Sequence, residues 1–323
     1  MFAVEIQSEI KALTEQAASK YTMHQLKAVS KEITRLYKEE SGRGKILVSD
    51  PVYAAVYSVV RMPATFGAVY SALYHTLECV EMKGQYTLLD VGAGTGAGAF
   101  AAAQLLELSE IICLEREKSM RELGKSFTDR FTEFLPQTEW TDADLRSELP
   151  RSADIVLSSY VLNEMTEKDR ISAVRKLWSH TEKLLLIVEP GTPEAFSQLM
   201  RIKKELEACT AETAAPCTCT GACPLEEDDW CHFTVRIQRS RLHRAIKEAD
   251  VPYEDEKFSY MAFVKEKPER KGSRILRHPV TGKGNIRLEL CGNDSRKNVT
   301  VTKRDRELFR SARKAQCGDL LMM

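Results

Sequence analysis

The 323-residue chain has no excess of charge of either sign and few aromatic residues. Lysine plus arginine number 47 and aspartate plus glutamate also number 47, while aromatic residues make up 7% of the chain. With 43% hydrophobic residues, this balance is typical of a folded globular protein and excludes both a disordered tail and a membrane bundle. The length allows two domains, or one domain with large additions.

A long uncharged hydrophobic run is also absent. The most apolar stretch, residues 52–80, is interrupted by Arg61, Pro63 and His75, whereas a membrane-spanning helix needs about 18 apolar residues in succession. The first residues lack the basic and apolar regions of a secretory signal and the arginine-rich composition of a transit peptide. These absences predict a cytoplasmic protein with no membrane partner.

Nine cysteines are present, but none forms the Cys-x2-Cys pair that structural zinc fingers favour. Because cytoplasmic thiols stay reduced, we expect no disulfides. Cys79 and Cys113 lie in apolar surroundings and are expected in the core. The other seven fall in the last 115 residues and are Cys209, Cys217, Cys219, Cys223, Cys231, Cys291 and Cys317.

Charge is unevenly distributed despite the zero total. Residues 265–314 contain sixteen Lys or Arg and six Asp or Glu, a net of +10, so the remainder carries −10. A basic region of this kind is typical either of a surface that binds a polyanion such as RNA, or of an ordinary solvated face. We expect no DNA partner.

The hydrophobic pattern predicts three parts. Helical periodicity dominates residues 1–84, with a loop at 41–44, and predicts an N-terminal helical domain. Residues 85–208 plus 240–265 alternate strands with helices, including a helix over 97–108, and predict an α/β Rossmann-like domain with a parallel sheet. Residues 209–239 plus 266–323 are cysteine-rich and basic, with short strands at 286–290 and 299–302 that predict a β extension.

A glycine turn follows the first predicted strand, in the sequence Asp90-Val91-Gly92-Ala93-Gly94-Thr95-Gly96. Glycines let the backbone approach a ligand closely. The spacing departs from the Gly-x-Gly-x-x-Gly of dinucleotide enzymes, although Gly98 lies nearby and the turn alone leaves that alternative open.

Three acids favour S-adenosylmethionine as the ligand of this turn. Asp90 suits the cationic methionine end, Glu115 ends the second strand where a carboxylate accepts ribose hydroxyls, and Asp144 stands where an acid meets the adenine amino group. The predicted cofactor site is therefore Asp90, Gly92, Gly94, Gly96, Glu115 and Asp144, in a class I methyltransferase fold.

Catalytic residues are not evident. The fourth strand is followed by Ser158-Ser159-Tyr160-Val161-Leu162-Asn163-Glu164, which has neither the Asn/Asp-Pro-Pro-aromatic run of base N-methyltransferases nor a Pro-Cys nucleophile. Tyr160 and Asn163 either orient a substrate or serve only packing and capping.

Cys217, Cys223, Cys231 and Cys291 have wide spacings that suit an iron-sulfur cluster better than zinc, because a cluster presents its irons at separate corners. Together with the glycine turn, four further segments resemble the methyltransferase-like 17 family of small-ribosomal-subunit proteins. These segments are Val188-Glu189-Pro190-Gly191-Thr192-Pro193, Cys223-Pro224-Leu225, Asp229-Trp230-Cys231-His232-Phe233 and Tyr253-Glu254-Asp255-Glu256-Lys257-Phe258-Ser259-Tyr260.

The resemblance implies association with the small ribosomal subunit or its rRNA, and a structural [4Fe-4S] cluster on Cys217, Cys223, Cys231 and Cys291, with zinc as the alternative metal. The chain has Thr218-Cys219 where the family has Pro-His, so Cys219 competes with Cys217 as the first ligand. Cys317 replaces a family tryptophan.

Three functions remain open at this stage. The first is an assembly factor, and the second is an active rRNA methyltransferase. The third is a redox or radical enzyme, for which the sequence lacks a full Cys-x3-Cys-x2-Cys run because Glu226 stands at the third position. A cluster would bring two basic segments together toward phosphates. These segments contain Arg236, Arg239, Arg241 and Arg244, and Arg270, Lys271, Arg274, Arg277, Lys283 and Arg287.

Overall fold

A computed structural model describes residues 2–40, 50–219, 222–226, 228–269, 272–292 and 295–322. The loop expected at 41–44 and the cations Arg270 and Lys271 lie outside these residues. The main sheet consists of β1 (Gln85–Val91), β2 (Glu107–Leu114), β3 (Thr138–Thr141), β4 (Ala153–Ser159), β5 (Thr181–Pro190), β6 (Glu212–Ala215), β7 (Phe233–Gln238) and β8 (Tyr253–Val264).

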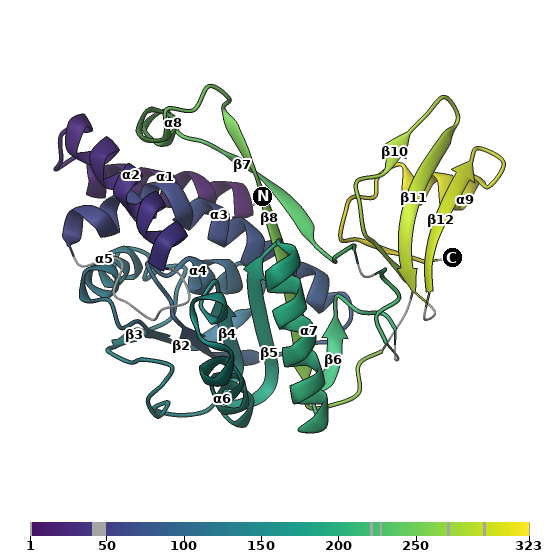
Figure 1. Ribbon diagram of the computed structural model, residues 1–323, viewed down its shortest axis with the longest axis horizontal. Coiled ribbons are helices and arrows are strands. Elements are labelled where there is room, and N and C mark those ends of the chain that lie inside the picture. Colours follow the sequence, from purple (N-terminus) through teal and green to yellow (C-terminus); the bar gives the residue numbers. More distant parts are fainter. Residues whose placement is uncertain are drawn as a thin grey trace.

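The main sheet has the order β3-β2-β1-β4-β5-β8-β6, and β7 pairs with a further part of β8 (Figure 1). Strands β1 to β5 are parallel, whereas β8 runs antiparallel to β5. This arrangement, with the glycine turn after β1, confirms the expected class I methyltransferase fold. Strand order reverses at β1, which places a ligand crevice at the carboxyl ends of β1, β2 and β4.

Helices follow the parallel strands. They are α4 (Ala97–Ala103), α5 (Lys118–Thr128), the 3₁₀ turn η1 (Leu162–Glu164), α6 (Glu167–Ser179) and α7 (Pro193–Ala208). Thr166 caps α6, because its hydroxyl accepts from the Asp169 N–H at 3.3 Å. The helix predicted over 97–108 is too long, since β2 already begins at Glu107, which pairs with Gln85.

The N-terminal helices are α1 (Phe2–Ala18), α2 (Met23–Glu40) and α3 (Pro51–Leu77). They do not form a separate domain over 1–84, because Ile10 of α1 and Phe66 of α3 belong to the same hydrophobic core as Leu88 of β1. Helix α3 is long and apolar enough by composition to cross a membrane, but 61% of its most apolar window is buried inside the protein, as in a core helix.

The C-terminal domain is the second sheet with its helix, and it lies to one side of the main sheet (Figure 1). It contains β9 (Ser273–Ile275), β10 (Val280–Thr281), β11 (Asn285–Gly292), β12 (Ser295–Thr302), α9 (Arg306–Ala312) and β13 (Leu320–Leu321). Its own core includes Ile275, Leu288 and Val301. The two predicted strands at 286–290 and 299–302 lie within β11 and β12.

Residues 209–239 do not belong with this domain as predicted. Both β6 and β7 pair with β8 of the main sheet, so backbone hydrogen bonding fixes the ends of this segment there. The cysteine-containing connection between them contacts the C-terminal domain through Thr218 and Asp229. Helix α8 (Arg241–Lys247) follows β7, and its Ile246 joins the cluster of Leu26 and Val56 from α2 and α3.

Arg274 joins the C-terminal domain to the rest of the molecule. Its side chain is 1% exposed. The guanidinium donates to the carbonyl oxygens of Pro216 at 3.2 Å, Gly318 at 2.7 Å and His75 at 3.4 Å, and pairs with Glu78 at 3.0 Å. One side chain therefore ties β9 to the end of α3 and to the segment that precedes Cys217.

We expect Arg274→Met to lower the free energy of unfolding by about 3 kcal/mol, because it leaves buried carbonyl oxygens without donors. Urea denaturation measures this loss. Arg287→Met is the matched control, since Arg287 is exposed on β11. Equal unfolding midpoints for the two variants would contradict the role given to Arg274.

Candidate functional site

The glycine turn forms one wall of a pocket at the crevice. Gly92, Gly94 and Gly96 have positive φ values of 73°, 58° and 90°, a backbone conformation that glycine adopts without strain. A Cβ on Gly92 would lie 2.2 Å from a methyl group of Val161. The backbone geometry of the turn therefore favours glycine at these three positions.

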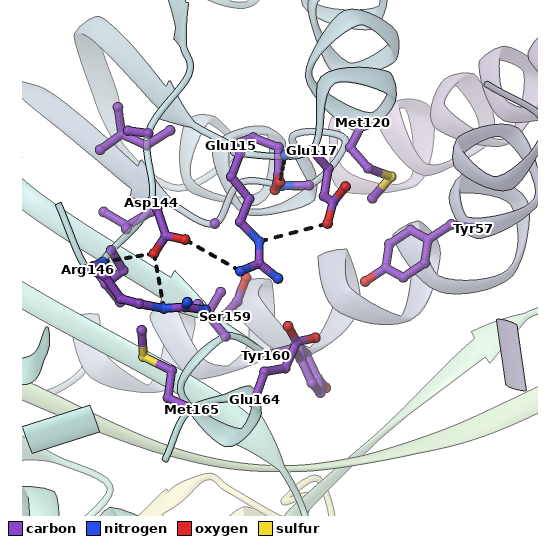
Figure 2. Close-up of a pocket in the computed structure, with 18 residues that line it drawn as sticks. Tyr57, Glu115, Glu117, Met120, Asp144, Arg146, Ser159, Tyr160, Glu164 and Met165 are labelled. Carbon is purple, nitrogen blue, oxygen red and sulfur yellow. Dashed lines mark hydrogen bonds and ion pairs between the residues drawn. The ribbon is translucent and has the colours of Figure 1, made fainter. Parts of the chain in front are cut away.

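Glu115 at the end of β2 holds this turn in place. Its carboxylate accepts from the Gly94 N–H at 2.8 Å and from the Glu117 N–H at 2.7 Å. Burial raises the pKa of Glu115, while these two N–H donors favour the charged form. The carboxylate lines the pocket (Figure 2), where two lone pairs on each oxygen leave room for further donors.

Arg116, which the sequence interpretation missed, extends across the same pocket. Its guanidinium lies 3.5 Å from the Asp144 carboxylate and 3.8 Å from that of Glu117 (Figure 2). Asp144 thus lies in the pocket as predicted, but it already has a cationic partner. The sequence signal for Arg116 was its position directly after Glu115, the acid at the end of β2.

The predicted cofactor residues separate into two groups. Gly92, Gly94, Glu115 and Asp144 line the pocket. Asp90 does not, because it is 0% exposed behind the turn and accepts from the Ala99 N–H of α4 at 3.0 Å. Its burial raises its pKa to about 7. Gly96 caps the start of α4 instead of lining the pocket.

Residues after β4 also line the pocket. Tyr160 lines it, but its hydroxyl donates to Glu256 at 2.8 Å, and Arg61 of α3 pairs with the same carboxylate at 3.0 Å. Glu164 also lines the pocket, and burial raises its pKa to about 7. Tyr57 of α3 also lines the pocket (Figure 2).

Asn163 serves the backbone in this structure. The N–H groups of Leu162 and Asn163 donate to Glu189 at 2.9 and 3.3 Å, which fixes η1 against the end of β5. Glu189 is buried, and its burial raises its pKa to about 8. The side-chain oxygens of Ser158 and Asn163, in contrast, are buried without a hydrogen-bond partner among the described residues.

A second pocket gathers the candidate metal ligands. It is lined by Cys217, Cys219, Cys223, Cys231 and Cys291, and we call it the cysteine pocket. The first four belong to the connection between β6 and β7, and Cys291 belongs to β11. The sulfur atoms of Cys219 and Cys291 lie 3.8 Å apart, and the Thr218 hydroxyl donates to the Cys291 carbonyl at 2.9 Å.

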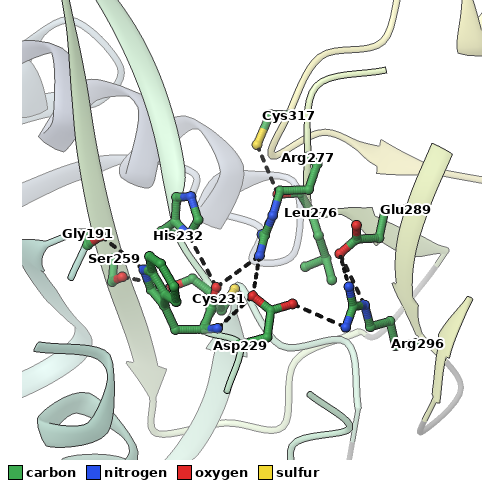
Figure 3. Close-up of polar contacts among 11 residues, drawn as sticks. Gly191, Asp229, Cys231, His232, Ser259, Leu276, Arg277, Glu289, Arg296 and Cys317 are labelled. Carbon is green, nitrogen blue, oxygen red and sulfur yellow. Dashed lines mark hydrogen bonds and ion pairs between the residues drawn. The ribbon is translucent and has the colours of Figure 1, made fainter. Parts of the chain in front are cut away.

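The segment Asp229-Trp230-Cys231 is held from both sides of the cysteine pocket (Figure 3). On the main sheet, the Trp230 indole donates to the Gly191 carbonyl at 3.0 Å, and the Ser259 hydroxyl donates to the Cys231 carbonyl at 2.7 Å. Toward the C-terminal domain, Asp229 pairs with Arg277 at 2.6 Å. It also pairs with Arg296 at 3.1 Å. These contacts bring three of the four resembling segments together in space, namely those that contain Gly191, Trp230 and Ser259.

Buried thiols resist ionisation in this pocket. Burial raises the pKa of Cys217 to about 11 and places that of Cys231 well above its usual range. Neighbouring cysteines raise both values further. Across the described ranges, no three His, Cys, Asp or Glu side chains are grouped to hold a single metal ion.

The remaining cysteines have structural contacts. Cys113 is 0% exposed and packs in the core, as predicted. Cys79 is half-buried, where its sulfur accepts from Arg274 at 3.2 Å. Cys317 donates to the Leu276 carbonyl at 3.3 Å and lies outside the cysteine pocket.

The two predicted basic segments do not form one surface. Arg236 pairs with Asp255 at 2.7 Å and Arg239 with Glu254 at 3.0 Å, both on the β7–β8 hairpin. Arg274 is buried, and Arg277 pairs with Asp229. Internal ion pairing therefore uses four of the eight described cations that the sequence pattern assigned to phosphates.

The chain is similar to solved structures of methyltransferases. A putative RNA methyltransferase from Pyrococcus horikoshii superposes with a TM-score of 0.41 at 17% identity, covering 73% of this chain and 96% of that one. Magnesium protoporphyrin IX methyltransferase from Synechocystis, with S-adenosylhomocysteine bound, gives 0.43 at 13% identity, with coverages of 72% and 91%.

Curated relatives are mitochondrial. The chain is 28% identical over 292 residues to human "Ribosome assembly protein METTL17, mitochondrial", covering 82% of this chain and 62% of the relative. It is 24% identical over 341 residues to Rsm22-cox11 tandem protein 2 of Schizosaccharomyces pombe, covering 88% and 44%. The chain thus spans less than two thirds of either relative.

These relatives contradict the cytoplasmic location that the sequence predicted, because both are described as mitochondrial. They confirm the resemblance to the methyltransferase-like 17 family. A family model described as "Mitochondrial small ribosomal subunit Rsm22" matches residues 51–322. Since the match spans most of the chain, this protein belongs to the Rsm22 family.

Proposed function

We propose that this protein is an assembly factor that binds the small ribosomal subunit through its rRNA. In this proposal the glycine-turn pocket holds S-adenosylmethionine and the cysteine pocket holds a structural [4Fe-4S] cluster. Membership in the Rsm22 family and the assembly role in the name of the human relative support the first part. The observation that carries RNA binding is the charge of the C-terminal domain.

Among the described residues of the C-terminal domain, nine cations are exposed, against two exposed carboxylates, Asp305 and Glu307. Among the described residues, none of the nine forms an ion pair with another side chain. A dense set of unpaired cations is the electrostatic footprint of phosphate binding. The nine are Lys283, Arg287, Lys297, Lys303, Arg304, Arg306, Arg310, Arg313 and Lys314.

Reversing three of these charges in one variant, Lys303→Glu, Arg306→Glu and Arg310→Glu, should weaken binding to small-subunit rRNA at least about tenfold at moderate salt. It should also reduce the salt dependence of log K by about 2 to 3. Fluorescence anisotropy over a salt series measures both quantities.

The matched control reverses Lys168, Lys183 and Lys204, which are exposed on α6, β5 and α7 of the main domain. It makes the same change in net charge away from the C-terminal domain. Equal losses in both triple variants would show that only total charge matters, and would contradict the assigned surface.

The glycine-turn pocket fits S-adenosylmethionine in its donor set. Glu115 offers a carboxylate to ribose hydroxyls, Asp144 offers one to the adenine amino group, and the glycines expose backbone. The Tyr160 hydroxyl beside the pocket is already engaged by Glu256. We therefore propose cofactor binding alone for this pocket.

Glu115→Ala should lower the affinity for S-adenosylhomocysteine by about tenfold or more, because it removes ribose acceptors and releases the Gly94 N–H. Isothermal titration calorimetry measures the affinity. Glu107→Ala, an exposed position at the start of the same strand, should bind as the parent does. Undiminished binding by Glu115→Ala would contradict the pocket assignment.

The cysteine pocket fits a cluster by its donors. Five thiols line one buried cavity, and four of them correspond to the cysteines that the family resemblance assigns as ligands, Cys217, Cys223, Cys231 and Cys291. The sulfur atoms of Cys219 and Cys291 lie 3.8 Å apart, and two thiolates bound to one tetrahedral zinc ion are also about 3.8 Å apart. Among the described residues, however, no third ligand completes such a zinc site. Thiolates spread over a wider space suit the corners of a cluster.

Anaerobically purified protein should contain about four iron and four acid-labile sulfide per chain. Cys231→Ser should lose both and melt at a lower temperature, because a metal centre contributes folding free energy directly. Cys209→Ser, outside the cysteine pocket, should retain them. Stoichiometric zinc without sulfide would contradict the cluster, as would equal melting temperatures for Cys231→Ser and the parent.

A further inference from the structure

A buried lysine faces the cysteine pocket. Lys203 lies on α7, lines the cysteine pocket, and is 6% exposed. Lysine is almost never fully buried without a partner, because its ammonium loses hydration. Its neighbour Lys204 on the same helix is exposed. Something at this pocket must offset the cost of burying Lys203.

Glu207 only partly supplies that compensation. Its carboxylate lies 3.7 Å from the Lys203 ammonium, one helical turn along α7, and its side chain is 44% exposed. The same carboxylate oxygen also accepts from the Thr213 hydroxyl at 2.9 Å. A long ion pair with a half-exposed partner is worth little, so the pocket side of the ammonium needs a negative charge.

The thiols of the cysteine pocket share its lining with the Lys203 ammonium. The positive charge of Lys203 opposes the effect of burial on the pKa of Cys217, whereas the other cysteines raise that pKa. Arg274 lines the same pocket, but Glu78 and backbone carbonyls already use its donors. Lys203 is thus the cation of the pocket whose charge is least compensated by its own neighbours.

We infer that Lys203 is a positioning residue for the cysteine centre, whose ammonium offsets the net negative charge of the thiolate-ligated metal. The inference rests on the proposed centre. Four thiolates around a [4Fe-4S] core of charge 2+ leave a net charge of about −2, and reduction by one electron increases it. A fixed cation nearby stabilises the bound centre and, more strongly, its reduced form.

The test compares anaerobically purified Lys203→Met, Lys203→Arg and Lys204→Met with the parent. Lys203→Met conserves volume but removes the charge, Lys203→Arg restores charge, and Lys204→Met removes an exposed charge from the same helix. The measurements are iron and sulfide content, the midpoint potential from a redox titration followed by electron paramagnetic resonance, and the rate of metal loss to a chelator.

We expect Lys203→Met to have a lower midpoint potential and about tenfold faster metal loss. Lys203→Arg and Lys204→Met should resemble the parent. If Lys203→Met does not fold, Lys203→Gln replaces it in the same measurements. A cluster-loaded Lys203→Met or Lys203→Gln with parental potential and chelator rate would overturn this inference alone. Parent protein without iron and sulfide would overturn the proposed centre.

Discussion

The structure depends on one buried guanidinium. Arg274 lies where α3, the segment before Cys217 and the C-terminal domain meet, and its donors serve three backbone carbonyls and Glu78. A cation in such a place is stable only while every donor is used. The C-terminal domain therefore has a fixed position against α3, which brings Cys291 to the four cysteines of the β6–β7 connection.

A second set of contacts maintains this arrangement from the opposite side. Trp230 is anchored to Gly191 of the main sheet, while Asp229 next to it pairs with Arg277 and Arg296 of the C-terminal domain. The cysteine pocket thus lies between two separately built cores. A centre bound there would complete a junction that protein contacts have already formed, which accords with a structural role in displaying the basic C-terminal domain.

Buried carboxylates fix the strand ends beside the glycine-turn pocket. Glu256 engages Tyr160 and Arg61, and Glu189 engages the backbone of η1, at the strand ends where methyltransferases carry out chemistry. Helix α3 packs across this edge and supplies Tyr57 to the pocket. The glycine-turn pocket and the attachment of the helical segment therefore share the same crevice.

The sequence by itself determined the parallel strands β1 to β5, the glycine turn and the set of candidate cysteine ligands, because these depend on local periodicity and on residue types with few alternative uses. Tertiary structure alone decided the rest. It placed Asp90 behind the turn and paired Arg236 and Arg239 internally. It also ended α4 early, because β2 pairs with β1 from Glu107. Burial and pairing depend on neighbours far away in the chain, which no local pattern specifies.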